Sequence, residues 1–316
     1  MDCSVVITTY NRARLLADTL RSLSAQQVPR ALRWEIVIVD NNSRDETREV
    51  VRRFSETTSL TVRYEFEPRQ GQSFARNLGI EVAEGAVILF TDDDILPSPD
   101  WVPRMLSTIA TGDLDGAGGR VLPLWEAEVP RWLASRRDLL PWLALTEEDQ
   151  ACMLQYPLLV TRRIVGASMA FRRGVFEEFG RFPTTLGHRG ARMYGGEEVE
   201  LVNRLLLKSK RIGYDPSIIV HHRIGADRLC KSFFLRRHFD HACGQAQFLP
   251  REIRTGIFGV DPRRYRRFLG LAWTTVAHTA LRRPDAFSLQ LGLAISAGSI
   301  WGTLRWPSRP HLDSGG

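Results

Sequence analysis

The stretch Val87-Ile88-Leu89-Phe90-Thr91-Asp92-Asp93-Asp94 places three adjacent carboxylates directly after an apolar strand. Neighbouring negative charges repel one another, so this segment is costly unless a cation offsets them. Carboxylate oxygens suit Mg²⁺ or Mn²⁺, which proteins often bind through one or two carboxylates plus substrate phosphates. In an extended chain Asp92 and Asp94 point one way and Asp93 the other, so we expect Asp92 and Asp94 on the metal side. The alternative is a solvated acidic turn.

Outward from this stretch, short apolar runs alternate with helical patterns. We expect strands at 4–9, 34–39, 60–66 and 86–90, and helices covering 15–23 and 71–83. This alternation predicts a mostly parallel sheet covered on both faces, in which ligands bind beyond the carboxyl ends of the strands. Polar clusters follow three of these ends, at Thr8–Asn11, Asp40–Asn42 and Asp92–Asp94. We therefore expect the three clusters to meet on one edge of the sheet.

The second half of the chain has a less regular pattern. We expect a strand at 116–124, an irregular tryptophan-containing stretch at 125–159, an apolar segment at 164–171, a helix at 197–207, a strand at 218–220 and helices from 227 onward. Charge divides the chain at residue 231, because the rest of the chain from there has 13 Lys/Arg against 5 Asp/Glu, whereas the first part has 30 against 31. The 316 residues suggest one or two domains.

The location of the protein is predicted from two absences. No secretory signal precedes the first strand, so we expect a cytoplasmic protein. The four cysteines are scattered without metal-type spacing, so reduced thiols are the default.

Four motifs occur in a characteristic order: Val6–Arg12, Ile38–Ser43, Gly71–Gly79 and Phe90–Asp94. As a set they resemble the family 2 glycosyltransferases of the GT-A fold, over roughly residues 2 to 245. The resemblance implies an α/β fold with a mixed, mostly parallel sheet flanked by helices. A GT-A domain would span 1–230, with a nucleotide-binding half at about 1–115 and an acceptor-side half at about 116–230. A basic helical extension would follow at 231–316.

The resemblance also implies roles on the nucleotide side. Thr8, Tyr10 and Asn11 would line the nucleotide pocket, and Asp40 would accept hydrogen bonds from the base. Arg76 and Asn77 would lie near the ribose and the pyrophosphate. A strand-end turn is the alternative for Asp40, and a surface helix arginine is the alternative for Arg76. Asp92 and Asp93 would also contact the nucleotide-sugar, with Asp93 structural or at the ribose.

A second set of roles concerns attack by the acceptor. The segment Gly195–Leu201 resembles the family motif whose acidic residue is the general base, and Glu198 occupies that position, with Glu197 in reserve. A positioned carboxylate that accepts the acceptor proton contributes typically 10²–10⁴-fold. The alternative is a helix N-terminal carboxylate stabilised by the macrodipole. Trp132 and Ser168 are the candidates on the acceptor side.

Two further residues are assigned to the metal and the diphosphate by the resemblance. His221 follows the apolar run Ile218–Val220 and would complete the metal site with Asp92 and Asp94, and Arg228 would face the diphosphate. The alternative for His221 is a buried, hydrogen-bonded histidine. The cofactor expected from this set is Mn²⁺ or Mg²⁺.

The basic tail carries a separate hypothesis. Phe268–Leu281 and Ala286–Leu304 contain no Lys, Arg, Asp or Glu. We expect a helical hairpin over 263–304 that lies on the inner face of the cell membrane, with an arginine cluster toward anionic lipid. That cluster comprises Arg263, Arg264, Arg266 and Arg267. A packed helical pair or an oligomer contact is the alternative.

The function expected is therefore inverting, metal-dependent transfer of a sugar from a nucleotide-diphosphate sugar to a hydroxyl. The acceptor class is a glycan, a lipid-linked glycan or a small molecule, and nucleic acid is not an expected partner. A sugar-nucleotide nucleotidyltransferase is the first alternative, but it would carry a glycine-rich phosphate loop where this chain has Thr8–Arg12. A non-catalytic nucleotide-sugar or carbohydrate-binding protein is the second, and it would not need Glu198.

Overall fold

The computed structural model describes residues 1–158, 164–190, 192–246 and 260–305. The chain packs as two compact units, which we describe separately. The first comprises Met1–Gly190 and Glu197–Leu229, and the second comprises Ala191–Gly196 and Cys230–Gly316. The short segment before Glu197 thus packs with the C-terminal helices, a detail that the expected division at residue 230 did not include.

The first unit is built on one large mixed sheet. Its strands are β1 Cys3–Thr9, β2 Trp34–Asp40, β3 Thr61–Phe66, β4 Val87–Asp92, β5 Ile95–Pro97, β6 Gly116–Trp125, β7 Cys152–Met153, β8 Met169–Arg172 and β11 Ile212–Ile224. Within the described residues the order is β3-β2-β1-β4-β8-β6-β11-β5, and β7 pairs with β11. The strands from β3 to β4 are all parallel, β6 is parallel to β11, and β8 is antiparallel to both neighbours. The expected α/β class with a mixed, mostly parallel sheet is confirmed.

The pairing register brings the expected polar clusters to one edge. Thr8 pairs with Asp92 across β1 and β4, and Thr9 pairs with Asp40 across β1 and β2. Asp40 in turn pairs with Phe66 at the end of β3. The carboxyl ends of four neighbouring strands therefore form a single row, as the sequence pattern predicted.

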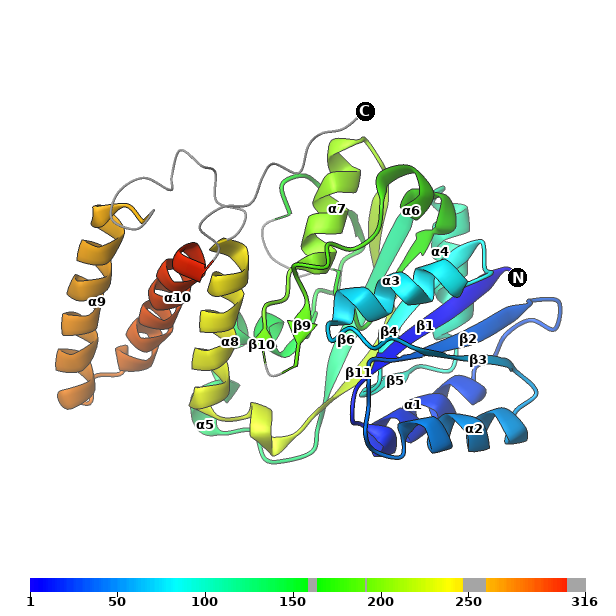
Figure 1. Cartoon of the computed structure of the whole chain (residues 1–316), viewed down its shortest axis with the longest axis horizontal. Helices are drawn as coiled ribbons and strands as arrows, with labels where there is room; N and C mark the ends of the chain where they lie inside the picture. The colour runs from blue at the N-terminus through cyan, green and yellow to red at the C-terminus, as the bar shows by residue number, and fades with distance from the viewer. Residues whose placement is uncertain (159–163, 191, 247–259, 306–316) are drawn as a thin grey trace. The chain divides into compact units, whose positions relative to one another are not determined.

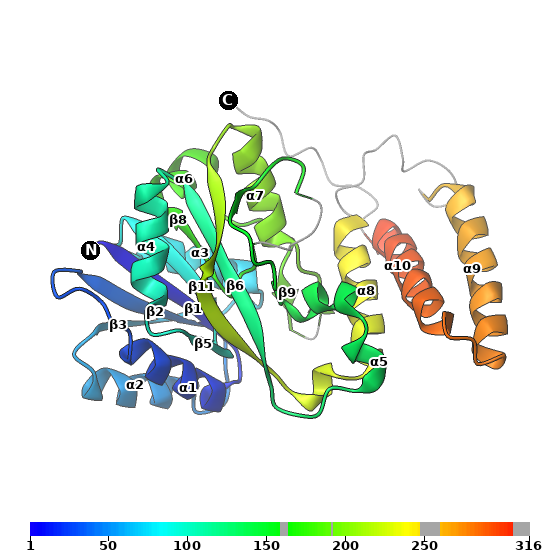
Figure 2. The ribbon, with the colours of Figure 1, turned by 180° about the vertical axis from the view of Figure 1, so that it is seen from behind.

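Helices cover both faces of this sheet. The helices of the first unit are α1 Ala13–Ser24, α2 Thr47–Thr57, α3 Gln72–Val82, α4 Trp101–Thr111, α5 Arg131–Ala134, α6 Arg173–Phe179 and α7 Glu197–Leu207, with 3-10 turns η1 Arg137–Leu143 and η2 Ala226–Arg228. Figure 1 shows α3 in front of the sheet, and the view from behind in Figure 2 shows α4 in front. In α1 the apolar stripe Leu16, Leu20 and Leu23 is fully buried, as its helical spacing predicts.

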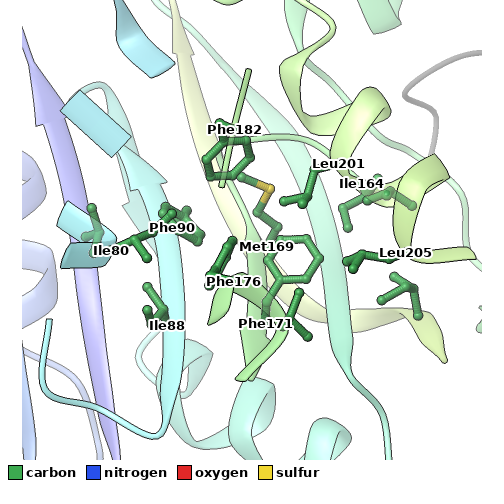
Figure 3. Close-up of a cluster of buried hydrophobic side chains, with 14 of the residues drawn as sticks. Ile80, Ile88, Phe90, Ile164, Met169, Phe171, Phe176, Phe182, Leu201 and Leu205 are labelled. Atoms are coloured by element: carbon green, nitrogen blue, oxygen red, sulfur yellow. The ribbon is translucent and has the colours of Figure 1, made fainter. Parts of the chain in front are cut away.

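A phenylalanine-rich cluster fills the face beneath α3, α6 and α7 (Figure 3). Phe90 of β4 makes edge-to-face contacts with Phe176 and Phe182, at centroid distances of 6.0 Å and 5.4 Å. Leu201 and Leu205 of α7 belong to the same cluster. Edge-to-face pairs add to the stabilisation that burial of the rings already gives. This packing fixes the start of α7, and therefore the carboxylates at its N-terminus.

The second unit consists of helices and one short strand. Its elements are β10 Arg192–Met193, α8 Lys231–Gln245, α9 Pro262–Ala280 and α10 Ala286–Arg305, whereas the short strand β9 His188–Arg189 belongs to the first unit. Asp240 of α8 is fully buried and accepts hydrogen bonds from the Arg192 guanidinium and from the Met193 backbone N–H, both at 3.1 Å. The segment before Glu197 is thus tied to α8.

Candidate active site

The chain turns directly after Asp92, and this turn separates the three carboxylates. β4 ends at Asp92, and Asp93 and Asp94 form a turn before β5. Asp93 and Asp94 are 4% exposed and both bind the same Arg12 nitrogen at 3.0 Å, whereas Asp92 faces Gln72 and Arg76. The expectation that Asp92 and Asp94 share one side is therefore wrong, because side-chain alternation applies only while the chain stays extended.

Asp93 is a structural carboxylate. It accepts hydrogen bonds from the Thr9 hydroxyl at 2.8 Å and from Arg12 at 3.0 Å. Burial raises the pKa of Asp93 to about 6, although the Arg12 charge opposes the shift. Of the two roles expected for Asp93, these contacts favour the structural one. Arg12 ends the motif Val6–Arg12, but the sequence alone indicated no role for it.

Asp94 lies among cations. Arg228 donates to one of its oxygens at 2.8 Å, and the His222 Nε2 lies 3.4 Å from the other. Burial opposes ionisation, but His222, Arg228 and Arg12 together hold the pKa of Asp94 well below its ordinary value. The carboxylate is therefore ionised, and Arg12 and Arg228 offset its charge.

The histidine beside Asp94 is His222, not His221. Burial alternates along β11, with Val220, His222 and Ile224 buried and His221 only partly buried. Because successive side chains of a strand point to opposite faces, only one of two adjacent histidines can face Asp94. His221 and His222 both follow the apolar run Ile218–Val220, so the sequence alone could not decide which of them faces Asp94.

Arg76 is a buried guanidinium that joins two parts of the site. It is 2% exposed, donates to Glu197 at 2.8 Å and lies 3.3 Å from Asp92. A Cβ added at Gly166 would lie 2.0 Å from an Arg76 nitrogen, so the guanidinium occupies space that only a glycine leaves open. The surface-arginine alternative is wrong. Its charge is directed at the carboxylates of Asp92 and Glu197, and its expected place near the ribose and the pyrophosphate stays a prediction.

Glu198 makes no ion pair among the described residues, unlike its neighbour Glu197. Glu197 pairs with Arg76, and one Glu198 oxygen is buried without a hydrogen-bond partner among the described residues. Burial, reinforced by the neighbouring Glu197 carboxylate, raises the pKa of Glu198 to about 8, although the Arg76 charge opposes the shift. Perturbation of this kind is typical of catalytic acids and bases.

The part of the edge that is expected to bind the nucleotide contains Asp40 and aromatic rings. Asp40 is 3% exposed and accepts hydrogen bonds from the Ser43 backbone N–H at 2.8 Å and the Tyr64 hydroxyl at 2.7 Å. Burial and this hydrogen bond raise the pKa of Tyr64. Tyr10, which follows β1, and Phe66, at the end of β3, remain 41% and 50% exposed on either side of the end of β2. Tyr64 and Phe66 were missed as candidates, although both lie at the end of an expected strand.

Asn11 connects two loops at the same edge. Its backbone N–H donates to the Ser43 hydroxyl, and its side-chain oxygen accepts from the Arg44 N–H at 2.7 Å. Its φ of 53° is left-handed, a conformation that asparagine tolerates better than most residues. Asn11 therefore shapes the loop beside Thr8 rather than presenting a free amide.

Three other expected site residues have structural surroundings. The Asn77 amide pairs in both directions with the Phe182 backbone, at 2.8 Å and 3.0 Å, so Asn77 anchors a loop and does not offer its amide to a ribose. Ser168 is fully buried and accepts a hydrogen bond from the Trp101 indole at 3.0 Å, so it is not on an acceptor surface. Trp132 lies half-buried on α5.

The donor set beside Asp94 fits a divalent cation. Asp94 offers an ionised carboxylate, and the His222 Nε2, which lies 3.4 Å from it and 2.7 Å from an Arg228 nitrogen, offers an imidazole donor. Within the described ranges, no group of three or more His, Cys, Asp or Glu side chains could hold a metal ion. A cation here would therefore depend on oxygens from the substrate, the mode in which Mg²⁺ is usually held.

Comparisons with known proteins identify the family of this chain. The family model "Glycosyl transferase family 2" matches residues 4–180. Glycosyltransferase AglE of Haloferax volcanii is 32% identical over 186 residues, which cover 58% of this chain and 56% of that protein. The succinoglycan biosynthesis protein ExoM of Rhizobium meliloti is 28% identical over 235 residues, which cover 74% and 70%. The chain thus spans only about half of the length of AglE.

Solved structures show the same fold. The mannosyltransferase PcManGT of Pyrobaculum calidifontis, in complex with GDP-Man and Mn²⁺, has a TM-score of 0.62 at 21% identity, covering 98% of this chain and 88% of that one. S. aureus TarS in complex with UDP-GlcNAc has a TM-score of 0.55 at 18% identity, covering 96% and 90%. The fold and the site define a glycosyltransferase with the GT-A architecture. The chain belongs to glycosyl transferase family 2.

Replacement of Arg76 by Met should destabilise the first unit by about 3–5 kcal/mol, because it leaves buried carboxylates without their cation. The double variant Arg76→Met/Glu197→Gln should recover part of this loss. Urea unfolding at neutral pH measures both. The matched control is Arg52→Met, which removes an exposed ion-paired arginine and should cost no more than about 1 kcal/mol. Equal losses for Arg76→Met and the control would refute the buried bridge.

Proposed function

We propose that this chain transfers a glycosyl group from a nucleotide-diphosphate sugar to an acceptor hydroxyl, in one step with inversion at the anomeric carbon. The observation that carries this proposal is the Glu197–Glu198 pair at the start of α7, in which Arg76 binds Glu197 and leaves Glu198 with a raised pKa. Family membership already separates this function from that of a nucleotidyltransferase.

Glu198 acts as the general base in this mechanism. Its carboxylate accepts the proton of the acceptor hydroxyl while the acceptor oxygen forms its bond to the anomeric carbon. The bond from that carbon to the diphosphate oxygen breaks in the same step, and the nucleoside diphosphate leaves with the electron pair. A pKa near the working pH favours this role, because a base must both accept the proton and remain largely unprotonated.

The leaving diphosphate would be stabilised at the Asp94 edge. Asp94 and His222 would hold a divalent cation, Mn²⁺ or Mg²⁺, with Asp92 on the ribose side. When bound, the cation neutralises the negative charge that develops on the diphosphate. Arg228 now contacts both Asp94 and His222, so its release from these atoms would free it for the diphosphate. The Mn²⁺ in the PcManGT complex supports a divalent cation.

The nucleotide would bind across the first three strand ends, with its base near Asp40 and the exposed rings of Tyr10 and Phe66. Residues 1–115 would form the nucleotide half, residues 116–230 the acceptor half, and residues 231–316 an extension. The GDP-Man and UDP-GlcNAc complexes of the neighbouring structures support a nucleotide-sugar donor.

We place the acceptor among glycans or lipid-linked glycans at the inner face of the cell membrane, where the enzyme would be peripheral; a small-molecule acceptor is the remaining class. One relative is named succinoglycan biosynthesis protein and another dodecaprenyl-phosphate galacturonate synthase, and these names support a cell-envelope or lipid-linked product.

Glu198→Gln should lower the transfer rate by about 10²–10⁴-fold, because an amide cannot accept the acceptor proton. Donor affinity, measured by calorimetry, should stay within about threefold, since the nucleotide-side residues are unchanged. Glu197→Gln is the comparison variant, and it should act mainly through stability. A Glu198→Gln enzyme with wild-type turnover would eliminate Glu198 as the base.

Transfer should rise with pH and level off above about 8. The active form of Glu198 is the carboxylate, and burial raises its pKa to about 8, so acidification removes the base. Below that pH the rate should fall about tenfold per unit. The groups that face Glu198 are Glu197, which raises its pKa, and Arg76, which lowers it. A rate profile at saturating donor that stays flat from pH 6 to 9 would contradict this expectation.

Hydrolysis of a panel of nucleotide-sugars should require Mn²⁺ or Mg²⁺ and stop in EDTA. His222→Ala should weaken the response to the metal by more than the roughly 10–100-fold typical of outer-shell partners. His221→Ala is the matched control and should change it little, because His221 lies on the other face of β11. Turnover that persists in EDTA would overturn the metal-dependent mechanism.

A further inference from the structure

The C-terminal unit contains two helices of different character. α10 is, within the described part of the chain, the single helix long and apolar enough to cross a membrane by length and composition, and 33% of it is buried. α9 carries three large apolar side chains that are mostly exposed, whereas Ile295 and Trp301 of α10 are 42% and 51% exposed. Leu269, Trp273 and Val276 are 65%, 78% and 65% exposed. These observations assign different roles to the two uncharged stretches.

α10 is packed against α8 through glycines. A Cβ added at Gly298 would lie 2.2 Å from the Phe239 carbonyl oxygen, and one added at Gly302 would lie 2.3 Å from the Cys243 carbonyl oxygen. The two backbones are therefore in close contact. α8 carries Arg236, Arg237 and the buried Asp240 within this segment. Charged groups of this kind are expensive inside a bilayer, so α10 belongs to a helical unit outside it.

α9 presents one continuous apolar stripe. Leu269, Trp273 and Val276 follow helical spacing, and Ala280 continues the same face. The opposite face is directed at α10, because Thr275 is buried and Arg264 donates to the Thr303 hydroxyl at 3.3 Å. Arg264 was expected to face lipid, but this contact directs it into the helix pair.

Arginines flank the stripe at both ends. Arg263, Arg266 and Arg267 are exposed at the start of α9, and Arg282 and Arg283 are exposed after its end. The acidic neighbours are engaged locally, since Asp261 caps the helix and Asp285 binds His278. A stripe of leucine, tryptophan and valine between two cationic ends matches an anionic bilayer surface, which offers acyl chains below and phosphates beside them.

A second copy of this chain fits the same face poorly. Two α9 helices that met through the stripe would place arginines against arginines in either relative direction, because both ends are cationic. A nucleic acid could bind the arginines through its phosphates, but it would leave the Leu269–Trp273–Val276 stripe exposed to water. The charge pattern thus favours lipid over both.

We propose that the Leu269–Trp273–Val276 face of α9 docks on an anionic lipid surface and lies parallel to it, while α10 remains a packed helix that does not cross the membrane. This inference deepens the peripheral membrane association proposed above. It does not depend on the transfer chemistry, so donor hydrolysis by the same proteins reports separately on the active site.

The test is sedimentation of the full-length chain with vesicles of phosphatidylcholine, with or without phosphatidylglycerol. The wild type should bind only the phosphatidylglycerol vesicles, and salt should weaken binding. The double variant Leu269→Ser/Trp273→Ser should lower vesicle binding by at least about tenfold, because it removes most of the apolar area that docking on the lipid would bury. Ile295→Ser, which alters an exposed side chain of α10, is the matched control and should bind like the wild type. All variants should keep wild-type donor hydrolysis.

Three outcomes would overturn the inference. The first is equal loss of binding in Ile295→Ser and the α9 double variant. The second is the absence of vesicle binding together with a dimer that the α9 substitutions dissolve, which would assign the face to a second copy. The third is resistance to carbonate extraction from cell membranes, which would make α10 a spanning helix.

Discussion

The buried guanidinium of Arg76 is the interaction on which the candidate site depends. It draws Asp92, at the end of β4, and Glu197, at the start of α7, to one cation. These residues come from the nucleotide edge and from the expected acceptor side. A buried charge needs compensation, so α7 cannot move away from β4 without leaving a carboxylate unpaired. One ion cluster therefore fixes the distance between the place where a leaving group would depart and the place where a base would act.

The distribution of cations also separates the roles of the acidic residues. Arg12 stabilises Asp93 and Asp94, Arg228 adds to Asp94, and Arg76 serves Asp92 and Glu197. Glu198 has no cation of its own, and its pKa rises while that of Asp94 falls. The surroundings of these two carboxylates thus shift their pKa values in opposite directions. Such a difference is a general way to divide acid–base roles within a site.

The sequence predicted the sheet class, the expected strands of the first half and their convergence, because period-two and helical patterns are local signals. It did not predict the antiparallel direction of β8, since a strand of four residues within an apolar segment carries no signal of its direction. Whether His221 or His222 faces Asp94 depends on the alternation of side chains along β11. The turn at Asp93 depends on where β4 ends. Ser168 was expected on the acceptor side, but it is buried against Trp101, which is distant in sequence.

Gly166 gives the charge cluster an unusual dependence on an uncharged residue. Its backbone is not left-handed, so a larger residue would be excluded by volume alone, through contact with the Arg76 guanidinium. Any side chain at position 166 would therefore have to push the Arg76 guanidinium away from Glu197 and Asp92. A directed-evolution library that randomises residue 166 by itself would thus test how firmly the ion cluster holds that guanidinium.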